Sequence, residues 1–248
     1  MESERRDQVA VWTLNNPPVN ALSWDVIQAL EELLREAEQD NQVRAVVITG
    51  SGLMFAAGAD IQGLTRLGGN LKEYLAKGAE LFQRLEASRL PVIAAVNGPA
   101  LGGGNELAMA ADLRIASPRA RFGQPEVALG IIPGWGGTVR LPQLVGMAHA
   151  RRLLLTGESI DASEAYRMGL IDQIVEPHLL VDAAVNVGDR LASVAPLALK
   201  AIKTLLSQEG PDAQHRETVE LTHLINTEDA LEGMRAFLEK RRPVFRGR

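Results

Sequence analysis

The sequence has no cysteine, and this absence removes several classes of function. Its 248 residues hold no disulfide framework, no thiolate metal site and no cysteine nucleophile. No apolar run reaches the roughly 18 residues that a membrane-spanning helix needs. Positive charge is not in excess either, because 26 Lys and Arg stand against 31 Asp and Glu, which excludes a strongly basic nucleic-acid binder. Residues 1–8 are charged, unlike a signal or transit peptide, so we expect a soluble, cytoplasmic protein.

Several common catalytic motifs are also missing. There is no Walker phosphate loop and no G-x-S-x-G nucleophile elbow. The glycine run at 102–104 lacks the third glycine of a dinucleotide-binding fingerprint. The four histidines show no metal-ligand spacing: His149, His178, His215 and His223. These absences count against a dehydrogenase, a serine hydrolase and a zinc enzyme.

What is present predicts an α/β fold. Apolar runs predict strands at 9–14, 45–49, 91–97 and 113–116. Helical spacing of apolar residues predicts helices after the cap residues Ser23 and Asp161 and at about 71–87, 107–111, 146–155, 178–193, 196–208, 213–225 and 228–239. Strands and helices alternate in the first half, which favours mainly parallel pairing. No Gly/Ser linker divides the chain, so we expect one integrated unit, with an α/β core at 1–195 and a C-terminal helical region at 196–248 that packs on a partner subunit.

Two loops at predicted strand ends are rich in small residues. Residues 55–61 follow the strand at 45–49, and 97–104 follow the strand at 91–97. Ligands bind at the carboxyl ends of parallel strands, and a helix start rich in glycine offers bare N–H groups. Two such loops side by side could direct two N–H donors at one oxygen, as in an oxyanion hole. The alternative interpretation is tight packing, since glycine is common in turns.

Two glutamates stand in apolar surroundings. Glu106 lies one turn into the helix that Gly103 opens, and Glu126 precedes the apolar stretch 127–134. Burial without a basic partner would raise both pKa values, which suits general acid–base chemistry. Each could instead be a helix cap or a surface acid.

Taken together, these segments resemble the crotonase (enoyl-CoA hydratase/isomerase) superfamily, and bacterial-type enoyl-CoA hydratases in particular. The resemblance rests on FAAGADI at 55–61, NGPALGGGNELA at 97–108, FGQPE at 122–126, IPGWGGT at 132–138, TGE at 156–158, AYRMGLID at 165–172 and FLEKR at 237–241. It covers nearly the whole chain, in the order of the family. It implies a spiral of β-β-α turns with a C-terminal helical region, assembled as a homotrimer or a dimer of trimers.

The resemblance also implies a function and its residues. The substrate would be an acyl-CoA thioester, as in β-oxidation, and no cofactor or metal would be needed beyond the coenzyme A in the substrate. The N–H groups of Ala59 and Gly103 would form the oxyanion hole. Glu106 would help activate the water, and Glu126 would give or take the proton at the α-carbon. Substrate-binding positions would be Ala57, Asp60, Ile61, Gln62, Pro133, Gly134, Phe237 and Lys240.

Three other functions remain open from the sequence. The first is another crotonase-type reaction, such as double-bond isomerisation or a pathway-specific dehydration, although isomerases commonly use one carboxylate. The second is an RNA-binding relative, disfavoured because the helix after Ser23 carries five acids against Arg35 alone. The third is a catalytically dead structural subunit, which the intact loops and both glutamates argue against.

Overall fold

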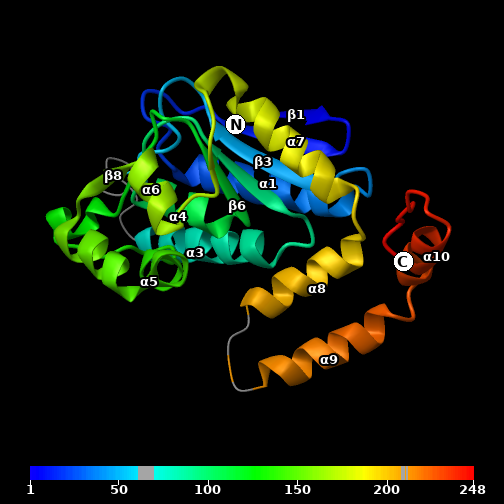
Figure 1. The fold of residues 1–248 in the computed structure, drawn as a ribbon. Helices are drawn as coiled ribbons and strands as arrows, with labels where there is room; N and C mark the ends of the chain where they lie inside the picture. Colours follow the sequence, from blue (N-terminus) through cyan, green and yellow to red (C-terminus); the bar gives the residue numbers. More distant parts are fainter. Residues whose placement is uncertain (61–69, 208–209, 211) are drawn as a thin grey trace.

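A mainly parallel sheet forms the centre of the fold in the computed structural model, which describes residues 1–60, 70–207, 210 and 212–248 (Figure 1). Its strands lie in the order β1-β2-β3-β4-β6-β9. Their bounds are β1 Glu2–Arg6, β2 Val9–Leu14, β3 Ala45–Gly50, β4 Val92–Val96, β6 Leu113–Ala116 and β9 Gln173–Ile174. All neighbours pair in parallel except β1 and β2, which are antiparallel. The predicted α/β class with mainly parallel pairing is therefore confirmed.

A second, small sheet lies at the end of the first. It has the order β5-β7-β8, with bounds Ala100–Leu101, Arg121–Gly123 and Ser159–Asp161. The first two of these strands follow closely on β4 and β6, so the chain continues from the large sheet into the small one. Isolated bridges from Leu22 to Ala59 and from Ala56 to Ala100 extend this layer to the loop after β3. The small sheet therefore joins the two glycine-rich loops.

Helices cover both faces of the large sheet. The bounds are α1 Trp24–Gln39, α3 Leu71–Ala87, α4 Gly103–Ala110, α5 Gly137–Thr156, α6 Ala162–Met168, α7 Leu180–Ala192, α8 Pro196–Ser207, α9 Ala213–Leu224 and α10 Glu228–Leu238, with short 3₁₀ helices η2 Pro125–Leu129 and η3 Pro177–Leu179. Alternate residues of β2 and β3 point to opposite faces. Val9 and Val47 pack with Leu180 of α7, whereas Trp12 and Ile48 belong to the core that contains α1, α3 and α4. Burial on both faces explains why these strands are apolar throughout.

The predicted helix caps are confirmed. The Ser23 side chain accepts a hydrogen bond from the Val26 N–H at the start of α1. The Asp161 side chain accepts one from the Glu164 N–H, 2.8 Å away, at the start of α6. Each cap satisfies an N–H group that has no acceptor within its helix.

Several elements differ from the sequence predictions. Strands β5, β7, β8 and β9, each of two or three residues, were not predicted. Strand β1 was not predicted, because its five residues are all exposed and mostly charged, as is common in edge strands. Helix α5 begins at Gly137, although the apolar spacing predicts a start near 146. The reason is a break inside α5: Gly146 has non-helical angles (φ 76°, ψ 157°), and Pro142 precedes it, so the helical pattern is clear only after the break.

The C-terminal helices extend away from the body of the fold (Figure 1). Helix α8 is attached by Lys203, whose buried ammonium donates to the Asp112 carboxylate and to the Leu90 carbonyl, each at 2.7 Å. Helices α9 and α10, and Ile225 between them, leave large apolar side chains exposed: Val219, Leu221, Ile225, Leu231, Met234, Phe237 and Leu238. Across the described part of the chain, no helix combines the length and the apolar character needed to span a membrane.

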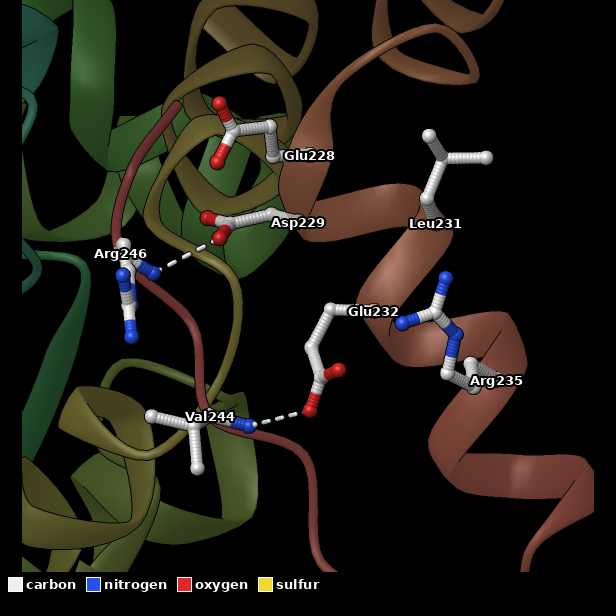
Figure 2. A pocket seen from close by; sticks show the side chains of 7 residues that line it. All are labelled: Glu228, Asp229, Leu231, Glu232, Arg235, Val244 and Arg246. Carbon is white, nitrogen blue, oxygen red and sulfur yellow. Dashed lines mark hydrogen bonds between the residues drawn. The ribbon is translucent and has the colours of Figure 1, made fainter.

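A hollow of about 480 Å³ lies between α10 and the last residues of the chain (Figure 2). Its carboxylates already hold the backbone of the tail. Glu232 accepts a hydrogen bond from the Val244 N–H at 3.0 Å, and Asp229 accepts from the N–H groups of Arg246 at 2.7 Å and Gly247 at 2.8 Å. These carboxylates fix the tail against α10.

Candidate active site

A pocket of about 120 Å³ forms where the two glycine-rich loops meet η2 and the turn before α5. The residues that line it are Ala57, Gly58, Ala59, Leu75, Gly102, Gly103, Glu106, Pro125, Glu126, Leu129, Ile131, Ile132, Gly134 and Trp135. The two glutamates are the acidic side chains among them, and most of the other side chains are apolar. An apolar pocket with a few polar groups is the usual form of a ligand site.

The two loops lie against each other, as their sequence predicts. The Leu101 N–H donates to the Ala56 carbonyl at 3.0 Å, and the Leu22 N–H holds the Gly58 carbonyl at 2.8 Å. A Cβ atom added at Gly103 would lie 3.3 Å from the Ala59 nitrogen. The Gly103 N–H is at the first position of α4, where no acceptor exists within the helix. The backbone nitrogens of Ala59 and Gly103 therefore lie close together at the pocket wall.

Glu106 is buried in the first turn of α4, with 2% of its surface exposed. Its Oε1 accepts hydrogen bonds from the N–H groups of Trp135 and Gly137, both at 2.7 Å. Burial raises the pKa of Glu106 to about 7, although these two N–H groups and the positive charge of Arg140 act in the opposite direction. The carboxyl can therefore take up and release a proton near neutral pH.

Glu126 faces Glu106 from η2 and is also buried. A Cβ at Gly102, whose φ is +53°, would lie 2.8 Å from Glu126 Oε1, so the carboxylate rests directly on this glycine. Within the described residues, Glu126 Oε2 has no hydrogen-bond partner. Burial raises the pKa of Glu126, and the negative charge of Glu126 in turn raises that of Glu106. The expected buried pair with raised pKa values is confirmed.

Trp135 forms the apolar wall behind these groups. Its ring makes edge-on contacts with Tyr74 and Phe82, with centroids 5.3 Å apart in each case, and its Nε1–H donates to the Leu75 carbonyl at 3.1 Å. The ring fits closely against Gly78 of α3, where a Cβ would lie 2.4 Å from Trp135 Cε2. The indole thus fixes the residue whose N–H holds Glu106.

Substituting Gly78→Ala is expected to destabilise the protein by about 1–3 kcal/mol through overpacking, because Trp135 must move. Urea unfolding would measure this loss of stability. Gly233→Ala in α10 is the matched control, since a Cβ there would meet nothing closer than 3.4 Å, at the edge of the Phe245 ring. Equal stability of the two variants would contradict the prediction.

The structure brings six of the twelve predicted site residues together at the pocket. Ala57, Ala59, Gly103, Glu106, Glu126 and Gly134 line the pocket. Asp60 and Pro133 adjoin it in sequence but are not among the described lining residues, while Ile61 and Gln62 lie outside the described residues. Phe237 lies in the last turn of α10 and Lys240 follows that helix; neither lines this pocket, and the Phe237 side chain is exposed.

Other parts of the site were not predicted from the sequence. The apolar wall includes Leu75, from α3, and Leu129, from η2. The hydrogen bonds from Trp135 and Gly137 to Glu106 were also not predicted, because backbone donors leave no residue-type signal. The sequence further suggested that no basic group lies near the glutamates, and this is wrong. Arg140 acts electrostatically on Glu106 from α5, more than 30 residues away in the chain.

The fold and the pocket define an α/β protein in which two buried glutamates and two glycine-rich loops line one pocket. The family model described as enoyl-CoA hydratase/isomerase matches residues 4–248, and the chain belongs to this family. A short-chain-enoyl-CoA hydratase of Clostridium acetobutylicum is 43% identical, over 96% of this chain and 94% of that protein. A crotonyl-CoA hydratase of Syntrophomonas wolfei is 42% identical, over 98% of this chain and 96% of that protein.

Solved structures agree with this assignment. The crystal structure of an enoyl-CoA hydratase from Bacillus anthracis superposes with a TM-score of 0.94 at 35% identity, covering 100% of this chain and 99% of that one. An enoyl-CoA hydratase subunit from Geobacillus kaustophilus gives a TM-score of 0.91 at 40% identity, covering 100% of this chain and 98% of that one. The crotonase fold implied by the sequence motifs is therefore confirmed.

Proposed function

We propose that this protein is an enoyl-CoA hydratase, which adds water reversibly across the 2,3 double bond of a 2-enoyl-CoA. The observation that carries the proposal is the meeting of Glu106, Glu126 and the amides of Ala59 and Gly103 at one apolar pocket. The names of the relatives, a short-chain-enoyl-CoA hydratase and a crotonyl-CoA hydratase, support a short acyl chain.

The two loop amides would stabilise the negative charge that develops on the thioester oxygen. Attack of water at the β-carbon moves an electron pair through the α-carbon onto this oxygen, which gives an enolate. Two N–H groups directed at that oxygen stabilise the transition state, and losing one such donor typically costs about 3–4 kcal/mol. Their backbone origin means that they need no reorganisation during the reaction.

The two carboxyl groups would handle the protons. Glu106, ionised, accepts a proton from the water as its oxygen bonds to the β-carbon. Glu126, protonated, donates a proton to the α-carbon as the enolate collapses, so that one water is added in total. The proton that Glu106 took from the water then returns to Glu126, which restores the starting protonation states. Raised pKa values support these roles, because a general acid or base works best when its pKa is near the working pH.

Other parts of the chain would bind coenzyme A, which enters as part of the substrate, so the reaction uses no separate cofactor. We propose that Asp60, Ile61 and Gln62 run along it, and that Phe237 and Lys240 reach it from a neighbouring subunit of a trimer or a dimer of trimers. The exposed apolar side chains of α9 and α10 support such an assembly, since patches of this kind mark interfaces. Hydration of this type serves β-oxidation.

Crotonyl-CoA provides the direct test. Purified protein is expected to remove the ultraviolet absorbance of the conjugated thioester, as the double bond takes up water. A folded protein that binds coenzyme A but leaves the absorbance unchanged would contradict short-chain hydration. Longer 2-enoyl-CoA and 3-enoyl-CoA substrates would then distinguish a longer-chain hydratase from an isomerase.

A further inference from the structure

Arg140 lies behind the turn at 135–137, which borders the pocket, and does not itself line the pocket. It belongs to α5, and only 8% of its surface is exposed. Its Nη1 donates to the Trp135 carbonyl at 2.7 Å. Its Nε and Nη2 donate to Glu86 Oε2 of α3, at 3.1 and 2.8 Å. The guanidinium thus ties the turn before α5 to a second helix.

The same turn holds Glu106. The Trp135 N–H and the Gly137 N–H both donate to Glu106 Oε1, while the carbonyl of Trp135 is bound by Arg140. Gly136, between them, has a φ of +109°, and a Cβ there would lie 2.0 Å from Arg140 Nη1. The turn can therefore pass this close to the guanidinium only with glycine at this position.

We propose that Arg140 is a positioning residue for the proposed hydration: by holding the Trp135 carbonyl, it keeps the two N–H donors of the turn aligned on Glu106 Oε1 and so fixes the direction of the Glu106 carboxyl in the pocket. This inference rests on the proposed function. Arg140 does not line the pocket, so it acts through the turn rather than on the substrate. A shift of about 1 Å in a reacting group can lower a rate about 10²-fold.

The positive charge of Arg140 also acts on the pKa of Glu106, and this effect can be separated from the hydrogen bond to Trp135. Among the described residues, the charged groups that act on Glu106 are Glu126 of η2, which raises its pKa, and Arg140 of α5, which lowers it. Removing the guanidinium charge is expected to raise the pKa of Glu106 further, whereas a lysine at 140 would keep the charge and lose the planar fork of donors.

The test compares Arg140→Met, Arg140→Lys and Glu86→Gln with the wild type. We expect Arg140→Met to lower kcat for crotonyl-CoA about 10- to 100-fold with KM changed less than about 3-fold, because only the carboxyl direction is disturbed. Arg140→Lys is expected to show a similar loss of kcat with an unchanged pKa of Glu106. Glu86→Gln keeps the hydrogen bond from Arg140 to the Trp135 carbonyl, so we expect a smaller loss of kcat in this variant.

A second measurement does not depend on turnover. Carboxyl signals of ¹³C-labelled glutamate, with Glu106 assigned by Glu106→Gln, give the pKa of Glu106 in each variant by NMR. We expect a higher pKa in Arg140→Met than in the wild type. If Arg140→Met does not fold, Arg140→Lys and Glu86→Gln carry the comparison of kcat.

Two outcomes would overturn the inference. Variants with a lower melting temperature but wild-type kcat would show that Arg140 only joins α5 to α3. An unchanged Glu106 pKa in Arg140→Met would show that the turn and the charge do not act on this carboxyl. A wild type that hydrates no enoyl-CoA would instead defeat the proposed function, and the NMR titration would still decide whether Arg140 acts on Glu106.

Discussion

Replacing Glu126 with glutamine is expected to lower kcat for crotonyl-CoA hydration about 10²- to 10⁴-fold, the usual contribution of a general acid or base. Glutamine has nearly the same shape but cannot transfer the proton to the α-carbon. The fold should tolerate the change, because the Glu126 carboxylate is buried on Gly102 and no described residue bonds its Oε2. A neutral amide replaces the neutral, protonated acid without placing a charge in the buried site.

The measurement for Glu126→Gln is steady-state turnover together with urea unfolding at pH 7. Glu36→Gln is the matched control, since Glu36 is exposed on α1 and does not line the pocket. We expect wild-type turnover in the control and an unchanged or increased free energy of unfolding in Glu126→Gln. Turnover within a few-fold of the wild type in Glu126→Gln would remove this residue from the mechanism.

Glu106→Gln is expected to lower kcat by a similar factor and, in addition, to change how stability depends on pH. Burial raises the folded-state pKa of Glu106 to about 7 from an ordinary value of 4.5. The folded protein then binds more protons than the unfolded chain between these values. The free energy of unfolding of the wild type should therefore fall as the pH rises from about 4.5 to 7, by about 3 kcal/mol from this residue.

Glutamine at 106 has no proton to lose, so this contribution to the pH dependence disappears. The amide oxygen can still accept the N–H groups of Trp135 and Gly137, which preserves the turn. Unfolding in urea at pH 5 and pH 8 measures the effect. From pH 5 to pH 8, the free energy of unfolding of Glu106→Gln should rise by about 2–3 kcal/mol relative to that of the wild type. If the free energy of unfolding depended on pH in the same way in both proteins, Glu106 would not be a buried acid with a raised pKa.

Much of the fold can be predicted from short stretches of sequence. The runs at 9–14, 45–49 and 91–97 are apolar enough to identify buried strands, and Ser23 and Asp161 mark helix starts by a local hydrogen bond. These signals depend on neighbours along the chain. The charged edge strand β1 could not be found in this way, because its pairing with β2 leaves its side chains exposed.

The candidate site also has a part that the sequence predicts and a part that it does not. The residue types alone determined that two glutamates and two glycine-rich loops were available, and the family motifs assigned them to one chemistry. Only the tertiary structure decided how they meet. It placed Trp135 against Gly78, directed two backbone N–H groups at Glu106, and set Arg140 behind the turn. The contacts of Trp135 with Gly78, and of Trp135 and Gly137 with Glu106, join residues 29 to 57 positions apart through backbone atoms and close packing. The physical reason is that such contacts depend on distance in space, which no spacing of residue types along this chain encodes.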